Sequence, residues 1–356
     1  MHHFSSENAT ESDKDSRGDP LWSPSAPESD EDSRGDPCGR PGNSWSPSAP
    51  ESDEYYGIDP LWSPSDTIYP ARDAERSQHS FDQVGTRFIA SPDAPIGLFD
   101  SGAGGLTILS ALRQELPCEN YIYFGDTAHC PYGLRSDAEV IKLSSQASQF
   151  LIDQGAKLIV VACNTASQTA LNTLRATFAV PFVGVVPAVK PAARATKKGR
   201  IGVAATNQAA KALYLRQLID EFAEGIEVYA VGCPELVTLV EQGELDGSGV
   251  EEVVRHALQP LLAKNVDVIV LGCTHFPALR PVIERITDHR VHVIDSGSAV
   301  ARRTRSVLNA EALIRQANSA SANGELRLWC SGNPAAFSAV SSKLLGYPVV
   351  ATQTTL

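Results

Sequence analysis

From residue 94 onward the sequence alternates short apolar runs with longer amphipathic stretches, and this alternation restricts the possible folds more than any other feature. Short apolar runs suit the buried strands of a parallel sheet, and the stretches between them have helical spacing. Helices are expected at 106–116, 136–154 and 250–263. Strands are expected at 96–99, 121–124, 158–162, 182–186, 201–204, 226–231, 266–271 and 291–294. The pattern predicts an α/β protein with parallel sheets.

The expected strands divide into two comparable halves. "IGLFDSG" begins at Ile96, 67 residues before Cys163, and "IGVAATN" begins at Ile201, 72 residues before Cys273. Similar strand motifs at similar distances from a cysteine indicate an internal duplication. Ligands of parallel α/β folds gather beyond the carboxyl ends of the strands. We therefore expect two pseudo-symmetric α/β domains with the functional site in the cleft between them: a first domain at 94–187, completed by 290–345, and a second at 188–289.

Residues 1–93 have a different composition and repeat themselves. "WSPSAPESDE" occurs at Trp22–Glu31 and again at Trp45–Glu54, and three of the four tryptophans lie in Trp-Ser-Pro. Pro, Ser, Asp and Glu dominate, with too few branched apolar residues to offset the entropy of ordering, so we expect a disordered N-terminal extension. Two interpretations of the repeats stay open: a short docking motif for an unknown partner, or a low-complexity extension without one.

The charge of the chain is concentrated in this extension. Residues 1–93 hold 19 of the 42 acidic and 7 of the 30 basic residues, and so account for the whole net charge of −12. The remainder has no basic excess with which to neutralise phosphates, so nucleic-acid binding is not expected. The sequence contains neither an uncharged apolar run of membrane length nor a signal-like N-terminus. We therefore expect no membrane insertion and a cytoplasmic protein.

Two of the seven cysteines stand in matched settings. "VVACNTAS" at 160–167 and "VLGCTHFP" at 270–277 each end an apolar run with a small residue, a cysteine and polar residues. A cysteine between a strand and a helix can be held as a thiolate, because the free N–H groups of a helix N-terminus favour negative charge. The odd number and single spacing of the cysteines argue against a disulfide framework and fit a reducing compartment.

Several uses of Cys163 and Cys273 compete. A buried cysteine is usually an inert small hydrophobe, but the flanks Asn164-Thr165 and Thr274-His275 offer hydrogen bonds that packing does not require. Zinc is weakly supported without a Cys-x-x-Cys spacing, so no metal is expected. A disulfide is disfavoured by the compartment, and a single nucleophile would leave one thiol idle. Two thiols facing one carbon would instead remove a proton from one face and supply one to the other, which is racemisation or epimerisation.

Two polar loops accompany these cysteines. "DSGAGG" at 100–105 is a glycine-rich strand-to-helix turn suited to close approach of a ligand or an anion. It lacks both the Walker ending and the GxGxxG spacing, so nucleotide binding is not expected. "GDTAHCPYG" at 125–133 is either an ordinary turn or a loop that closes over a small ligand. The remaining cysteines lack matched polar flanks and are interpreted as structural or, for Cys38, as part of the extension: Cys38, Cys118, Cys130, Cys233 and Cys330.

The motifs together resemble the glutamate racemase family. "IGLFDSGAGG", "GDTAHCPYG", "ACNTAS", "CPELVTLVEQG", "LGCTHFP" and "VIDSG" occur in the order and approximate spacing of that family, and the similarity covers about residues 95–345, including "CSGNPAAF". The resemblance implies a homodimeric, cofactor-independent enzyme that interconverts L- and D-glutamate and supplies D-glutamate for bacterial peptidoglycan. The extension lies outside the resemblance.

The resemblance also implies roles for individual residues. Cys163 would act on D-glutamate and Cys273 on L-glutamate, with Asp100 and His275 assisting the proton transfers. Glu241 matches a polar residue of the family's cleft, although a helix-surface glutamate is an alternative interpretation. Substrate contacts are implied for eight residues: Ser101, Pro131, Tyr132, Gly133, Asn164, Thr165, Thr206 and Thr274.

One segment departs from the family, and three other functions stay open. Many members have Ala-Thr-x-Gly-Thr where residues 205–209 read Ala-Thr-Asn-Gln-Ala, so Gln208 and Ala209 replace residues that help to hold a substrate carboxylate. This bears on substrate affinity or identity. The alternatives are a racemase for another acidic amino acid such as aspartate, a small-molecule binding module, and an interaction protein that acts through its extension.

Overall fold

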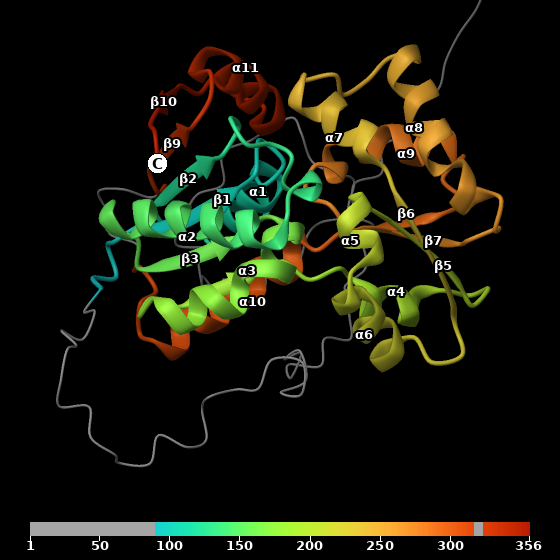
Figure 1. Cartoon of the computed structure of the whole chain (residues 1–356), viewed down its shortest axis with the longest axis horizontal. Coiled ribbons are helices and arrows are strands. Elements are labelled where there is room, and N and C mark those ends of the chain that lie inside the picture. The colour runs from blue at the N-terminus through green and yellow to red at the C-terminus, as the bar shows by residue number, and fades with distance from the viewer. Residues whose placement is uncertain (1–89, 317–322) are drawn as a thin grey trace, which may run out of the picture. The chain divides into compact units, whose positions relative to one another are not determined.

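The computed structural model describes residues 90–316 and 323–356. The expected disorder of the extension and its Trp-Ser-Pro repeats fall on residues 1–89, outside the described part of the chain. The described residues form two parallel sheets covered by helices (Figure 1). All eight strands expected from the sequence are present, with ends within two residues of the expected ones.

The first sheet has six strands in the order β10-β9-β2-β1-β3-β4. Each neighbouring pair is parallel. Alternate side chains of β1 enter different cores, since Ile96 and Leu98 face α1 and α10 whereas Phe99 faces α2 and α3. The strands are β1 Ile96–Asp100, β2 Tyr121–Gly125, β3 Leu158–Val161, β4 Phe182–Gly184, β9 Leu326–Cys330 and β10 Ala351–Gln353.

The second sheet has four parallel strands in the order β6-β5-β7-β8. They are β5 Arg200–Ala205, β6 Glu227–Gly232, β7 Val268–Leu271 and β8 His292–Ile294. The first four strands of the chain, β2-β1-β3-β4, have the same order. Cys163 after β3 and Cys273 after β7 therefore occupy equivalent places. The prediction of two pseudo-symmetric parallel-sheet α/β domains is confirmed.

The sheets extend beyond the domain limits drawn from the sequence. β8 pairs with β7, with Val268 opposite His292, so the second sheet continues past residue 289. β9 and β10 were not expected as strands, and β10 carries the first sheet past residue 345. Both strands are parallel to their neighbours and expose polar side chains such as Arg327 and Gln353, so a search for apolar runs does not find them. The exact domain limits stay a prediction.

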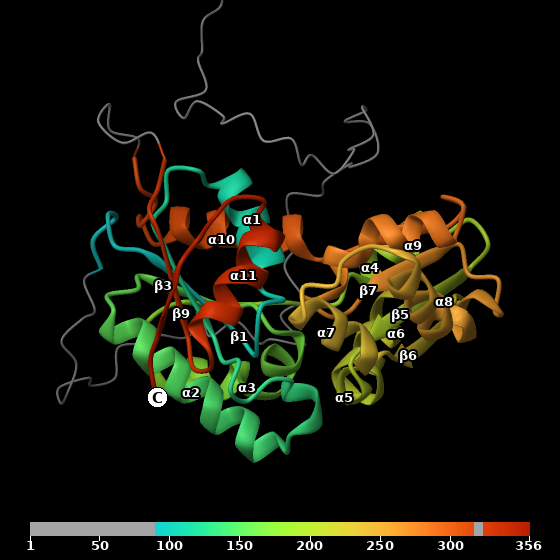
Figure 2. The same cartoon turned by 90° about the horizontal axis from the view of Figure 1, so that it is seen from above.

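Helices cover both faces of each sheet (Figures 1 and 2). Helices α2 and α3 pack on one face of the first sheet, and α1, α10 and α11 on the other. In the second sheet, α7, α8 and α9 pack opposite α4, α5 and α6. The helices are α1 Leu106–Glu115, α2 Asp137–Asp153, α3 Asn164–Thr177, α4 Val189–Ala195, α5 Asn207–Lys211, α6 Leu213–Phe222, α7 Pro234–Glu241, α8 Ser248–Leu262, α9 Arg280–Ile286, α10 Gly297–Ala310 and α11 Pro334–Leu345, with 3₁₀ turns η2 Tyr132–Leu134 and η3 Phe276–Leu279.

None of the helices in the described part of the chain has the length and apolar character needed to span a membrane.

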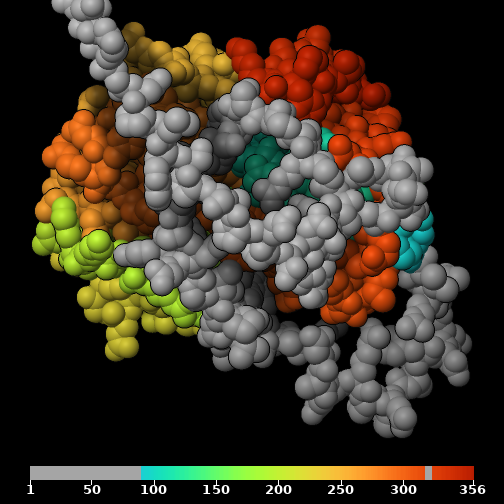
Figure 3. Space-filling view, turned by 180° about the vertical axis from the view of Figure 1, so that it is seen from behind, coloured from blue at the N-terminus to red at the C-terminus, as the bar shows by residue number. Residues whose placement is uncertain are grey.

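Seen from behind, the segments of the second sheet in yellow to orange and the C-terminal segments in red occupy separate sides of the surface (Figure 3).

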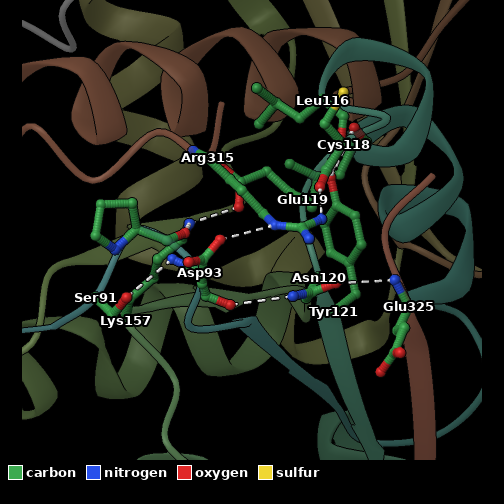
Figure 4. Close-up of polar contacts among 12 residues, drawn as sticks. Ser91, Asp93, Leu116, Cys118, Glu119, Asn120, Tyr121, Lys157, Arg315 and Glu325 are labelled. Atoms are coloured by element: carbon green, nitrogen blue, oxygen red, sulfur yellow. Dashed lines mark hydrogen bonds and ion pairs between the residues drawn. The ribbon is translucent and has the colours of Figure 1, made fainter. Parts of the chain in front are cut away.

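A buried ion pair anchors the start of β3. The Lys157 ammonium lies 2.5 Å from Glu119 Oε2 and also donates to the Pro92 carbonyl. The other carboxylate oxygen of Glu119 accepts from the Arg315 backbone N–H. Both side chains of the pair are almost completely buried. The cluster, drawn in Figure 4, connects the segment before β1 and the segment after α10 to the start of β3.

Candidate active site

The polar residues singled out from the sequence meet at the carboxyl ends of strands from both sheets. Asp100 ends β1, Cys163 follows β3, Thr206 follows β5 and Cys273 follows β7. This clustering is expected for parallel sheets, whose strand ends share one edge. Hydrogen bonds between residues of the two sheets, described below, hold the two groups together.

Cys163 lies at the N-terminus of α3 with extended backbone angles. Its Sγ is 3.9 Å from the Ser101 hydroxyl, and only 5% of the residue is exposed. Burial raises the pKa of the Cys163 thiol to about 12, and the charge of Asp100 adds to this, while N–H groups of Ala166 and Ser101 oppose it. In the ligand-free protein Cys163 is therefore a protonated thiol at neutral pH.

Cys273 belongs to a second group, built around His275. Nδ1 of His275 lies 3.6 Å from Cys273 Sγ, and its Nε2 lies 2.6 Å from Glu241 Oε1. Burial alone lowers the pKa of His275, but hydrogen bonds with Cys130, Cys273 and Glu241 outweigh it and raise this pKa well above its usual value. The imidazole is therefore a cation at neutral pH, next to the Cys273 sulfur.

Glu241, the last residue of α7, connects the two sheets. Its Oε1 accepts a 2.6 Å hydrogen bond from the Ala103 backbone N–H in the glycine-rich turn. Burial tends to raise the pKa of Glu241, but hydrogen bonding and the charge of His275 make the net shift downward. The carboxylate is thus ionised and paired with His275, so Glu241 is placed with the cleft residues and not on an open helix surface.

Asp100 holds the two cysteine groups together. One oxygen accepts from the Gly102 N–H at 2.9 Å and the Ser101 hydroxyl at 3.0 Å, and the other accepts from the Thr274 hydroxyl at 2.7 Å. Asp100 is fully buried, and burial raises the pKa of its carboxyl despite these hydrogen bonds and the charge of His275. The Thr107 hydroxyl adds a 2.8 Å hydrogen bond to the Thr274 carbonyl.

The glycines of "DSGAGG" are required by the approach of side chains from the second sheet. A Cβ on Gly104 would lie 2.3 Å from His275 Nδ1, and one on Gly102 would lie 2.1 Å from Glu241 Oε1. Neither distance is compatible with a side chain. In the described residues this turn receives protein groups in the place where the sequence analysis expected a ligand or an anion.

The other expected substrate contacts divide into two sets. Thr165 and Thr206 face each other, with their hydroxyl oxygens 3.4 Å apart, and the Thr206 hydroxyl also caps α5. Gly133 packs against Thr206, because a Cβ there would lie 2.8 Å from Thr206 Cβ. Tyr132 is different: its hydroxyl donates to Asp126 Oδ2 at 2.7 Å, within its own loop. Pro131 precedes it in the same loop, after a cis peptide bond.

Asn164 has a buried polar atom without a partner. Its Nδ2 makes no hydrogen bond within the described residues, although the residue is only 3% exposed. A buried donor without an acceptor costs roughly 1–3 kcal/mol, which a bound acceptor would recover. Gln208, where the chain departs from the family, donates a 2.8 Å hydrogen bond to Asp137 at the start of α2.

Sequence reasoning missed the position of Cys130. This residue was interpreted as structural because it lacks the matched polar flanks, yet it lies with Glu241 and His275. No local signal indicates this, since the contact depends on how the 125–133 loop folds. Of the described cysteines, five are free thiols: Cys130, Cys163, Cys233, Cys273 and Cys330.

The fold and the residues at the strand ends agree with what comparison with known protein families shows. The family model for Asp/Glu/Hydantoin racemases matches residues 106–304, more than half of the chain. A glutamate racemase from Herpetosiphon aurantiacus is 43% identical over 248 residues, covering 70% of this chain and 96% of the relative. One from Pseudomonas aeruginosa is 39% identical over 261 residues, covering 73% and 97%. The chain therefore belongs to the Asp/Glu racemase family, among the glutamate racemases.

Solved structures agree with this assignment. Glutamate racemase from Bacillus anthracis has 32% sequence identity and a TM-score of 0.66, covering 74% of this chain and 98% of its own. The Francisella tularensis enzyme, solved in complex with D-glutamate, has 33% identity and a TM-score of 0.64, with coverage of 74% and 98%. The Escherichia coli enzyme, solved with L-glutamate and an activator, has 34% identity and a TM-score of 0.64, covering 73% and 97%.

Three buried thiols are expected to make the folded protein less stable at alkaline pH. Burial raises the pKa of Cys163 and of Cys233 to about 12 and that of Cys130 to about 11. An unfolded chain loses these protons near pH 8.5, so above that pH the unfolded state binds fewer protons than the folded state and is stabilised relative to it. We expect the free energy of unfolding to fall by roughly 1 kcal/mol per pH unit and per thiol between about pH 9 and 11. These thiols should have no effect below about pH 8.

Urea unfolding at a series of pH values measures this slope. The Cys233→Ala variant should lose stability less steeply with pH than the wild type, whatever its stability at neutral pH. Equal slopes for the two proteins would contradict the assignment of raised thiol pKa values.

Proposed function

We propose that this chain interconverts L- and D-glutamate without a cofactor, using Cys163 and Cys273 as a pair of acid/base groups. The observation that carries the proposal is the equivalent placement of the two thiols after β3 and β7, with Asp100 and His275 between the two sheets. The relatives named above are glutamate racemases, and two were solved with an enantiomer of glutamate bound.

In the direction from L- to D-glutamate the two thiols take opposite roles. Cys273, beside the His275 cation, would be the base that removes the α-proton of L-glutamate. Cys163, a thiol because burial raises its pKa to about 12, would deliver a proton to the opposite face. The cycle leaves Cys163 as the thiolate and Cys273 as the thiol, which is the state that accepts D-glutamate.

The main energetic difficulty is that an amino-acid α-proton is a very weak acid. Hydrogen-bond donors aimed at the substrate carboxylate stabilise the charge that develops, and one such donor contributes roughly 3–4 kcal/mol in oxyanion holes. Donors at this site are the Asn164 amide and the hydroxyls of Thr165 and Thr206. The Ser101 and Thr274 hydroxyls donate to Asp100 and would turn from it to reach the substrate. Exclusion of water from the buried site strengthens each of these interactions.

Asp100 and His275 would assist different thiols. Asp100 organises the turn that carries Ser101, which faces Cys163, and it accepts from Thr274 next to Cys273. His275 places its positive charge next to Cys273, and Glu241 fixes the ring through Nε2. We place Pro131, Tyr132 and Gly133 at the rim of the site. We also propose that the chain forms a homodimer and supplies D-glutamate for peptidoglycan synthesis in the cytoplasm.

A panel of amino acids tests the substrate. Purified protein without added cofactor should convert L-glutamate to D-glutamate and the reverse, followed by circular dichroism until the signal reaches zero. Aspartate enantiomers should react at least about tenfold more slowly, because a side chain one methylene shorter loses contacts worth about 1–3 kcal/mol. Faster conversion of aspartate would assign the chain to that substrate, and absence of any conversion would favour a binding protein.

A further inference from the structure

Cys130 approaches the Glu241–His275 pair of the proposed site, a contact that the racemisation does not require. Cys130 Sγ, a Glu241 carboxylate oxygen and a ring nitrogen of His275 all lie within 4.8 Å of one another. They come from three distant segments: the loop before η2, the end of α7 and the residue before η3. Among the described residues this is the group with the composition of a metal site.

The absence of a side chain at Gly102 lets the turn approach the cluster closely. A Cβ on Gly102 would lie 2.1 Å from Glu241 Oε1 and 3.0 Å from Cys130 Sγ. The backbone of the turn therefore lies directly against both ligand atoms. Glu241 remains oriented by the Ala103 N–H, which fixes one carboxylate oxygen between the turn and His275.

The donor set selects the kind of ion. Sulfur, imidazole nitrogen and a carboxylate oxygen together suit zinc and similar first-row ions, whereas Mg²⁺ and Ca²⁺ prefer oxygen ligands alone. Ligands bound to zinc at about 2.0–2.3 Å lie about 3.5 Å apart in a tetrahedron. His275 Nε2 and Glu241 Oε1, now 2.6 Å apart in a hydrogen bond, would separate by about 1 Å to reach that spacing, and Cys130 Sγ lies within 4.8 Å of both ligand groups. Three protein ligands would leave the fourth position open.

We propose that Cys130, Glu241 and His275 form an inhibitory binding site for a zinc-type divalent cation. On binding, the thiol and the imidazolium each release a proton to solvent, and sulfur and Nε2 donate their electron pairs to the ion. His275 then changes from a proton-bearing cation hydrogen-bonded to Glu241 into a metal ligand.

The consequence for activity rests on the proposed function. If His275 assists Cys273 in proton transfer, the bound ion removes that assistance and blocks racemisation. The binding itself does not depend on the reaction, so the two claims are tested by separate measurements.

Cobalt titration tests the binding. Chelator-treated, reduced protein is titrated with Co²⁺, whose thiolate complexes absorb in the near ultraviolet. We expect one Co²⁺ per chain, a thiolate-to-cobalt band, and its loss when Zn²⁺ is added. Cys130→Ala should abolish the band and weaken Co²⁺ affinity at least about tenfold, the lower end of what loss of even an outer-shell partner costs.

Matched variants show which sulfur binds. Cys330→Ala, which removes another buried free thiol, should keep the band. Cys130→Ser, nearly unchanged in size, should lose it while unfolding at the same temperature as the wild type, which excludes misfolding as the cause. A band that persists in Cys130→Ser but disappears in Cys163→Ala or Cys273→Ala would place the ion on the other thiols and overturn the proposal, as would the absence of any binding.

Racemisation is then measured with and without Zn²⁺ in each protein. Zinc should inhibit the wild type and Cys330→Ala at concentrations at least about tenfold lower than those that inhibit Cys130→Ala. Binding without inhibition would confirm the site and reject the role of His275. A protein that racemises no amino acid but binds Co²⁺ through Cys130 would reject the proposed function while leaving the metal site intact.

Discussion

Replacement of either Cys163 or Cys273 by alanine is expected to lower the rate of glutamate racemisation by about 10²–10⁴-fold, the range that a positioned acid or base contributes. Each thiol serves one face of the α-carbon, so neither can substitute for the other. The rate is measured by circular dichroism from both enantiomers, and it should fall equally in both directions because the equilibrium constant of a racemase is one.

Cys330→Ala is the matched control for these variants. It removes a buried free thiol at the end of β9, which β2 separates from β1, and its sulfur contacts the Gly332 carbonyl and none of the proposed site residues. Its racemase activity should stay within a few-fold of the wild type. A Cys163→Ala or Cys273→Ala protein that folds normally and retains more than about a tenth of the activity would show that the remaining thiol suffices, contrary to the effect expected of an essential acid or base.

Lys157→Met should reduce the free energy of unfolding by about 3–5 kcal/mol, because it leaves the Glu119 carboxylate buried without its counter-charge. Lys157 directly precedes β3, whereas Cys163 follows the other end of that strand. Racemase activity per folded molecule should therefore be retained at low temperature. Denaturant unfolding followed by fluorescence or circular dichroism measures the change.

Two further variants separate charge burial from general disruption. Arg290→Met breaks the exposed pair with Asp288 and should cost less than about 1 kcal/mol. Adding Glu119→Gln to Lys157→Met should recover part of the loss, because the uncompensated charge is removed. If Lys157→Met costs no more than Arg290→Met, the buried pair does not anchor β3 in the way described.

The sequence predicted the parallel architecture because its central strands are continuous apolar runs. β1, β2, β3 and β7 are buried along their whole length, and each was expected within two residues of its observed ends. β9 and β10 were not predicted because exposed polar residues interrupt both strands. The place of β9 next to β2 depends on pairing with residues some 200 positions away, which local patterns do not encode.

The sequence predicted those residues of the candidate site that lie at the ends of strands. Asp100, Cys163 and Cys273 were found in this way, because carboxyl ends of parallel strands share one edge. The pairing of Glu241 with His275 and the approach of Cys130 depend on how α7 and a loop fold onto the second sheet. Such contacts between distant segments have no periodic signature, so the cluster around His275 emerged only from the structure.

The most direct test of the two-thiol proposal is the fate of the α-proton. L-glutamate is incubated with the protein in deuterated water without cofactor, and both enantiomers are separated early in the reaction and analysed by mass spectrometry. Because one thiol removes the proton and the other supplies a solvent-derived one, D-glutamate should carry α-deuterium while the remaining L-glutamate keeps its proton. D-glutamate that retains the original proton, or a complete lack of exchange, would contradict the account.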